Sequence, residues 1–160
     1  MIAGDRQDRS NEGSSARAAN EGRLVRWPLF RELRADTFAT LTGLMRMESH
    51  PPGQLLLLDG ERYESIYIVA RGFVSHSQMS VEGREHVLGY LGPGRLLNLV
   101  AVLDGGGQPG TLQSITPADL YVIPAVAFLS LMATRTDLAS WSWSEHGNLD
   151  TPVEYLCQIA

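Results

Sequence analysis

The sequence predicts an α+β domain that is mainly β: an antiparallel jelly-roll barrel with helices at its N- and C-terminal ends. Apolar residues follow a helical spacing over residues 37–47. Short apolar runs, separated by turn signals about every 8–12 residues, then continue from residue 50 to residue 124. A second helical pattern begins after Pro124. Because no helical segments separate the strands, a parallel α/β sheet is excluded.

The N-terminal third is expected to supply a leader and two helical segments. Residues 1–22 are rich in Gly, Ser, Asn, Asp and Arg, so they predict a disordered leader with almost nothing to bury. Residues 28–33 (PLFREL) fit one short helical turn. Residues 37–47 fit a longer helix, with Asp36 as its candidate N-cap. This helix is expected to lie over the domain that follows.

About eight short strands are expected in the centre of the chain. The signals for them are the leucine run 55–58, strand-like residues on both sides of Gly72, a tight turn at Glu82–Gly83, a strand at 85–91, a turn at 92–94, and strands at 111–115 and 119–123. We assign residues 23–135 to one folded domain and residues 136–160 to a C-terminal helical or irregular tail.

Composition and charge restrict the class of protein. The chain has 160 residues, of which 44% are hydrophobic and 19% charged, which suits a single globular domain. Its formal net charge is −5, and all 13 basic residues are arginines. Proteins that grip nucleic acid with their own surface usually carry a basic patch, so direct DNA binding by these residues is not expected.

Cysteine usage and hydropathy point to the cytoplasm. Cys157 is the single cysteine, so no internal disulfide can form. No apolar run reaches the length of about 18 residues that a membrane-spanning helix needs. The polar N-terminus does not match a signal peptide. We therefore expect a cytoplasmic protein without a membrane partner.

Six segments carry a resemblance to a known family. They read PLFREL, PPGQLLLLDGE, IYIVARGFV, EGREHVLGYLGPG, LLNLVAVLDGG and LYVIPAVAFLSLM. In this order and spacing, residues 28–132 resemble the sensor domain of the CRP/FNR family of bacterial transcription regulators. Glycines fall where that fold turns its corners, at Gly60, Gly72, Gly83 and Gly94. The resemblance implies a cyclic-nucleotide-binding-like jelly roll that senses an effector and has no enzyme activity.

The resemblance also implies which residues would bind a cyclic nucleotide. Family members that do so carry a cassette similar to Gly-Glu, an apolar run, and Arg-Ser or Arg-Ala. The glutamate receives the ribose hydroxyl, and the arginine neutralises the phosphate. We call residues 96–111 the cassette. Here the Gly-Glu pair falls on Asn98 and Leu99, and the Arg-Ser pair on Gln108 and Pro109.

Loss of the two charged groups predicts that cAMP and cGMP do not bind. A buried phosphate without a cation is unfavourable by about several kcal/mol. Pro109 also removes one backbone N–H donor. The remaining pocket suits an apolar or neutral effector, or else its leucines simply fill the barrel. Its expected residues are Leu88, Gly89, Leu96, Leu97, Asn98, Leu99, Val100, Gln108, Pro109 and Thr111.

Two alternatives involve metal chemistry. His76 and His86 flank the Glu82–Gly83 turn, and a tight hairpin would make them diagonal neighbours on one face, where they are candidate haem ligands. Exposed strand histidines are the simpler interpretation. A cupin-like metalloenzyme would need closely spaced His-x-His and a further histidine, which this sequence lacks. The cofactor, if any, stays unknown at this level.

The C-terminal part lacks the output module of a complete regulator of this family. Such regulators continue with a long dimerising helix and a helix-turn-helix domain, neither of which is visible here. We expect DNA contact only through a helix-turn-helix outside these residues, and a homodimer through the C-terminal helix. Trp141, Trp143 and Tyr155 would form an interface patch or pack over the barrel end. An excised sensor domain, a natural stand-alone domain and a degenerate remnant all fit.

Overall fold

The fold was determined as a computed structural model, which describes residues 22–27 and 30–140. The expected leader, apart from Gly22, lies outside the described residues. So do Trp141, Trp143, Tyr155 and the rest of the expected tail beyond residue 140.

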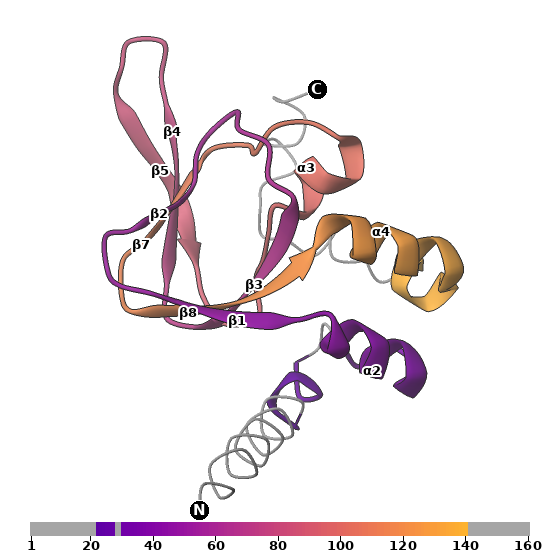
Figure 1. Ribbon diagram of the computed structural model, residues 1–160. Helices are drawn as coiled ribbons and strands as arrows, with labels where there is room; N and C mark the ends of the chain where they lie inside the picture. Colours follow the sequence, from indigo (N-terminus) through magenta and orange to yellow (C-terminus); the bar gives the residue numbers. More distant parts are fainter. Residues whose placement is uncertain (1–21, 28–29, 141–160) are drawn as a thin grey trace, which may run out of the picture.

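Two antiparallel sheets of four strands form the body of the domain (Figure 1). One sheet has the order β1-β8-β3-β6 and the other β2-β7-β4-β5, which confirms the predicted jelly roll of eight strands. The strands are β1 (Arg46–His50), β2 (Leu55–Leu57), β3 (Ser65–Arg71), β4 (Val74–Met79), β5 (Glu85–Leu91), β6 (Leu96–Leu97), β7 (Thr111–Ser114) and β8 (Ala118–Pro124).

Three helices that lie entirely within the described residues accompany the sheets. They are α2 (Ala35–Gly43), α3 (Leu99–Asp104) and α4 (Ala125–Thr134). Helix α4 begins directly after Pro124, as expected from the fixed φ of proline next to a helix start. Figure 1 shows α2 and α4 on one side of the barrel, with the β4–β5 hairpin extending away from them.

Alternation along the strands divides the interior into two cores. In β3, Ile66 and Ile68 face the helices, whereas Val69 faces the other sheet. The inter-sheet core contains Leu57, Val69, Val74, Leu97, Leu112 and Leu120. The helix-side core contains Leu24, Phe30, Leu41, Ile66, Ile68, Ala70, Leu96, Leu99, Tyr121, Ile123, Phe128 and Leu138.

The expected helix over 37–47 is shorter than predicted. Helix α2 ends at Gly43, and Met47 lies instead in strand β1, paired with Tyr121 of β8. The apolar spacing at 44, 45 and 47 is compatible with either structure over so few residues. Backbone pairing with β8 decides in favour of the strand. Strand β8 lies about 75 residues away along the chain, so the local spacing of apolar residues contains no information about this pairing.

One corner glycine is required by close packing. Gly72 has φ +87, and a Cβ at this position would lie 2.2 Å from the carbonyl oxygen of Pro117. A side chain here would meet both an unfavourable backbone conformation and a fixed backbone atom. Gly60, Gly83 and Gly94 share the positive φ, so all four expected corner positions turn as predicted.

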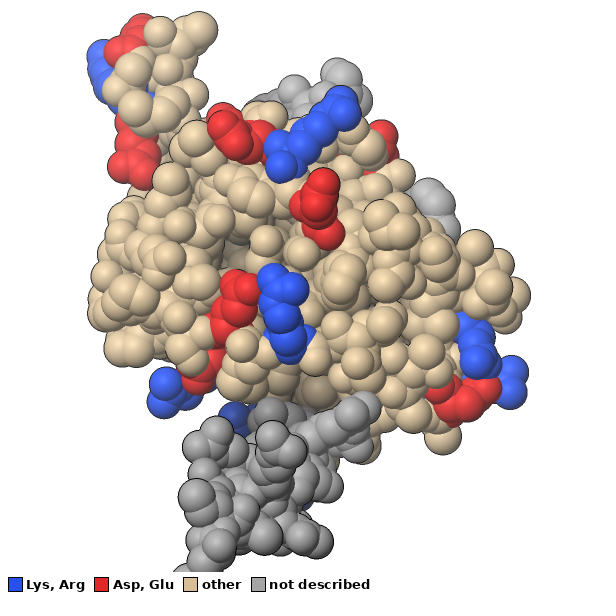
Figure 2. Space-filling view, in the orientation of Figure 1, with Lys and Arg blue, Asp and Glu red and all other residues tan. Residues whose placement is uncertain are grey.

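On the face shown in Figure 2, basic side chains (blue) and acidic side chains (red) are scattered, and several lie next to a side chain of opposite charge. At the tip of the β4–β5 hairpin, for example, Arg84 and Glu82 approach to 3.0 Å. No broad basic area covers this face, so it lacks the usual electrostatic footprint of a nucleic-acid-binding surface.

Candidate ligand site at the cassette

Asn98 forms the junction between β6 and α3. Its backbone is left-handed, with φ 66 and ψ 10, and among the described residues it is the only non-glycine with positive φ. The side-chain amide Nδ2 donates hydrogen bonds to the carbonyl oxygens of Ser65 at 2.8 Å and Tyr63 at 3.4 Å. Asn98 therefore ties the start of α3 to the start of β3.

Leu99, where the resemblance would place the acid, is 3% exposed. It packs in the helix-side core together with Leu96 and Phe128, on the first turn of α3. An apolar side chain at this point joins the cassette to the helices. A carboxylate here would have to leave that core or lie in it without a partner.

Gln108, where the resemblance would place the arginine, is 4% exposed and is hydrogen-bonded to backbone groups of Gly60, Glu61 and Pro109. Its backbone N–H donates to Glu61 O at 2.7 Å, and its backbone carbonyl accepts from Gly60 N at 2.8 Å. Its side-chain Nε2 donates to Pro109 O at 3.2 Å. The side chain thus presents a neutral amide, whose buried Oε1 has no hydrogen-bond partner among the described residues.

His76 of β4 lies against the cassette loop. Its Nε2 is 2.6 Å from the carbonyl oxygen of Pro109, so this nitrogen carries the proton and donates. A Cβ on Gly110 would lie only 2.4 Å from the same nitrogen. Burial lowers the pKa of His76, against smaller opposing effects of the Pro109 hydrogen bond and the Asp59 charge. A largely neutral ring therefore covers the Pro109–Gly110 backbone.

A carboxylate accepts the hydrogen bond of the next backbone N–H in the loop, that of Gly110. Asp59 Oδ1 accepts a hydrogen bond from Gly110 N at 2.9 Å, and the Asp59 N–H is 3.3 Å from the Thr111 hydroxyl oxygen. Pro109 has no N–H, so neither of these consecutive residues offers a free amide to an anion. The local charge is negative, which disfavours a phosphodiester.

A model of the cyclic nucleotide-binding domain matches residues 47–135, more than half of the chain and all of the elements just described from β1 to α4. The chain belongs to the cyclic nucleotide-binding domain family. The cassette is formed here by β6, α3 and the loop to β7, and Asn98 adopts the left-handed conformation at the position where the resemblance would place the glycine.

Curated relatives are bacterial regulators. The chain is 24% identical over 116 residues to a CRP-like cAMP-activated global transcriptional regulator of Mycobacterium tuberculosis, covering 72% of this chain and 52% of that protein. The chain thus spans about half the length of the curated relatives it matches.

Solved structures share the fold of this cyclic nucleotide-binding domain. The sensor domain of the transcriptional regulator DNR from Pseudomonas aeruginosa has a TM-score of 0.71 and 19% identity, covering 82% of this chain and 88% of that one. A mutant regulatory subunit of a cAMP-independent protein kinase A from Trypanosoma brucei, bound to cAMP in the A site, has a TM-score of 0.73 and 14% identity. It covers 91% of this chain and 53% of that one.

The remaining expected pocket residues differ in how deeply they are buried. Leu96 and Leu97 are buried, and Gly89, Val100, Pro109 and Thr111 are partly buried. Leu88 differs from the expectation, because it is 45% exposed. A bulge between His76 and Ser77 leaves Leu88 without a partner in the ladder.

The two candidate haem histidines have different surroundings. His76 pairs with Gly89, and His86 pairs with Gln78, which makes them diagonal on the β4–β5 ladder. His86 is exposed, whereas Nε2 of His76 is used by Pro109. Within the described part of the chain, no group of three or more His, Cys, Asp or Glu side chains is placed to hold a metal. None of the helices described here is long and apolar enough to cross a membrane.

Sequence reasoning missed the roles of Asp59 and His76 in the cassette. Alternation in β4 was a usable signal for His76, because Val74 on the same face lies in the inter-sheet core. Asp59 gave no such signal, since its contact with Gly110 joins two loops 51 residues apart.

Replacement of His76 by glutamine is expected to weaken the dependence of stability on pH. Because the folded pKa of His76 is lowered, the unfolded chain binds the proton first as the pH falls below about 6.5. The free energy of unfolding should therefore decrease from pH 7.5 to pH 5.5 by more in the natural chain than in His76→Gln. Urea unfolding at both pH values measures this, and equal decreases in the two proteins would contradict it.

Proposed function

We propose that this chain is the effector-sensing domain of a CRP-like transcription regulator and that it does not respond to cAMP or cGMP. The observation that carries the proposal is the content of the cassette. Leu99 stands in place of the acid and packs in the core, and the neutral amide of Gln108 stands in place of the guanidinium. Such a domain is regulatory rather than catalytic.

The charges around the cassette loop support the second half of the proposal. Asp59 accepts a hydrogen bond from Gly110 N, and His76 donates one to Pro109 O. The side chains nearest the loop are therefore already hydrogen-bonded to the backbone of the loop. A cyclic phosphate entering here would meet a carboxylate and would find no guanidinium. Its charge would stay poorly compensated, at a cost of about several kcal/mol.

The Trypanosoma brucei structure is compatible with this second half of the proposal. That subunit belongs to a cAMP-independent kinase, and the cAMP-bound structure is of a mutant with three substitutions, one of which introduces an arginine. An introduced arginine that accompanies cAMP binding in a domain of this fold is what the proposal expects, because arginine supplies the paired donors that a phosphate needs.

The proposal places the sensor in the cytoplasm and its output in a DNA-binding domain. A neutral or apolar effector would shift the population of cassette conformations, and α4 would transmit the change to a dimer partner. Leu99 and Phe128 pack in the same core, so the cassette and α4 are mechanically connected.

Calorimetric titration tests the proposal. We expect no heat of binding from cAMP or cGMP up to about 1 mM. A dissociation constant of that size corresponds to a binding free energy of only about −4 kcal/mol. Micromolar binding of either nucleotide would overturn the argument from lost charges. An absorption spectrum of the purified protein tests the haem alternative, since a Soret band would favour it. Elemental analysis tests the cupin alternative in the same way through bound zinc, iron or manganese.

A further inference from the structure

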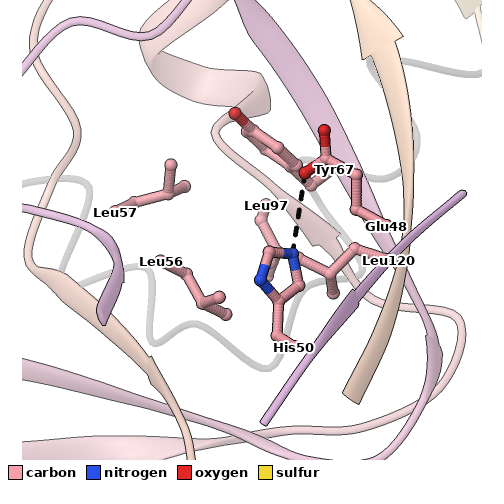
Figure 3. Close-up of a pocket in the computed structure, with 7 residues that line it drawn as sticks. All are labelled: Glu48, His50, Leu56, Leu57, Tyr67, Leu97 and Leu120. Atoms are coloured by element: carbon pink, nitrogen blue, oxygen red, sulfur yellow. Dashed lines mark ion pairs between the residues drawn. The ribbon is translucent and has the colours of Figure 1, made fainter. Parts of the chain in front are cut away.

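Within the described residues the two sheets have four edge strands, and three of these are protected against pairing with another chain. Strands β2 and β6 are short, with three and two residues. Strand β1 carries charged groups beside a cavity of about 60 Å³ (Figure 3). There Glu48 lies 2.8 Å from the Arg46 guanidinium and 3.6 Å from His50 Nε2. Short edges and charged edges both oppose edge-to-edge association.

Strand β5 lacks these forms of protection. It is the outer strand of the sheet β2-β7-β4-β5, it has seven residues, and β4 is its neighbour on one side. None of its residues is buried, Glu85 is its one carboxylate, and it contains no proline. Figure 1 shows the β4–β5 hairpin extending away from the helices. The outer edge of β5 therefore presents a row of backbone N–H and C=O groups to solvent.

Apolar side chains are concentrated on the same hairpin. Among the described residues, twelve large hydrophobic side chains are exposed, and half of them lie between residues 73 and 91. They are Phe73, Met79, Val81, Val87, Leu88 and Tyr90. An exposed edge strand that is also apolar is a candidate for association with another strand.

Both faces of β5 are open, which restricts the kind of partner. His86 and Val87 are consecutive, so their side chains point to opposite faces of the sheet, and both are exposed. A partner that lay flat on one face would leave the other face in water. A strand added at the edge would contact both faces and would also bond the free backbone groups.

We propose that β5 pairs antiparallel with β5 of a second copy of this chain, about a twofold axis at Leu88, so that two four-stranded sheets become one sheet of eight. Antiparallel pairing of a strand with itself is isologous, so both copies use the same surface and the contact closes. The register about Leu88 uses all seven residues of each strand. It sets Val87 opposite Gly89 of the second copy.

The residues of β5 suit this register. A Cβ on Gly89 would meet nothing within 4 Å, so the Val87 side chain of the second copy has room beside it. Glu85 faces Leu91 of the second copy, and the two Glu85 carboxylates lie six residues apart along the pair, about 20 Å. That separation exceeds the screening length of about 8 Å at physiological salt. A parallel alignment would instead place the two carboxylates side by side, which is unfavourable.

The expected affinity is low. Leu88 has no partner on β4, and the bulge there increases the local twist of the edge. One added strand also buries less than the roughly 1,200–2,000 Å² of a stable interface, so we expect a dissociation constant of about 0.1–1 mM. Each chain has a formal charge of −5, so added salt should strengthen the association by screening the repulsion.

This contact is independent of the proposed function of the cassette. Strand β5 ends at Leu91, before the cassette begins at Leu96. A dimer formed through the C-terminal helix would use a different surface. It would persist in variants of β5, so the two associations are distinguished by which variant removes them.

Backbone amide shifts and translational diffusion test the pairing in the full chain. Between about 20 μM and 1 mM, amides of residues 85–91 should shift and diffusion should slow, because this range spans the expected dissociation constant. Val87→Lys with Tyr90→Lys places like charges on both copies and should weaken the association at least about tenfold. Both residues are exposed, so the fold should be kept. Met47→Lys, on the charged edge strand β1, is the matched control and should associate as the natural chain does.

A cysteine at the twofold axis tests the register. In a Cys157→Ser background, Leu88→Cys places two thiols opposite each other, and oxidation by glutathione disulfide should link them into a covalent dimer. Glu85→Cys is the control. Its two thiols would lie about 20 Å apart, whereas a disulfide needs Cα atoms within about 7 Å.

Several results would overturn the proposal. Amides of β5 that stay constant up to about 1 mM would show that the edge does not self-associate in this range. Association that is unchanged by the two lysines would place the contact elsewhere, such as on the C-terminal helix. Equal cross-linking through positions 85 and 88 would indicate random collision. Amides of β5 that ignore concentration but shift when residues 141–160 are removed would assign the edge to the chain's own C-terminal segment.

Discussion

A variant carrying Leu99→Glu, Gln108→Arg and Pro109→Ser is expected to bind cAMP at least about a hundredfold more tightly than the natural chain. Charge-assisted hydrogen bonds contribute about 1.5–3 kcal/mol each, and this variant regains both the acid for the ribose and the guanidinium for the phosphate. The serine also restores a backbone N–H that proline lacks.

The imidazole of His76 is the main obstacle to this gain. Its ring donates to Pro109 O and lies against Gly110, so it competes with a nucleotide for the space beside the loop. Addition of His76→Val should open that space and increase the affinity further. The Asp59 carboxylate stays close, which limits the gain.

Calorimetry with cAMP measures the gain in this restored variant. The matched control keeps Leu99→Glu and Pro109→Ser but retains Gln108, and it should lose most of the affinity because the phosphate again lacks a cation. Circular dichroism and thermal unfolding must first show that the restored protein is folded, because Leu99 lies in a core. A folded variant with no measurable cAMP binding would contradict the electrostatic explanation of the cassette.

Truncation of Phe128 to alanine is expected to lower the free energy of unfolding by about 3–5 kcal/mol, the usual range for a fully buried phenylalanine. Phe128 is 0% exposed and joins α4 to β3 and β8 in the helix-side core. The midpoint of thermal unfolding should fall by about 10 °C or more. The matched control on the same helix is Val126→Ala, because Val126 is 77% exposed.

Thermal and urea unfolding of the two α4 variants distinguish packing from helix propensity. Val126→Ala should change the free energy of unfolding by less than about 0.5 kcal/mol. Equal losses in both variants would mean that α4 is marginal as a helix and that the contact of Phe128 with the sheet contributes little.

Local sequence signals were sufficient for much of the fold. Strand β5 has the predicted bounds 85–91, because its turns on both sides contain glycine. Helix α4 follows Pro124 as predicted. The helix over 37–47 was extended too far, since β1 exists only through pairing with β8, and that pairing is a tertiary contact.

The same limit explains what was missed at the sites. With residues 46 and 47 assigned to a helix, the neighbouring Glu48 and His50 could not be recognised as residues of a strand that pairs with β8. The substitutions at Leu99 and Gln108 could be read from the resemblance alone. The hydrogen bonds of His76 and Asp59 to the backbone of the loop could not be read from it. Both of these contacts join segments more than 30 residues apart.

The paired backbone bonds of Gln108 have a consequence for how the cassette opens. Its N–H and C=O bond Glu61 and Gly60 respectively, and a Cβ on Gly107 would lie 2.4 Å from the Gly60 oxygen. The loop and the Gly60 turn are therefore zipped together and separate only as one cooperative unit. A molecule that lifts the loop therefore has to expose the amide protons of Gln108 and Gly60 together, with the same free energy of opening in hydrogen exchange.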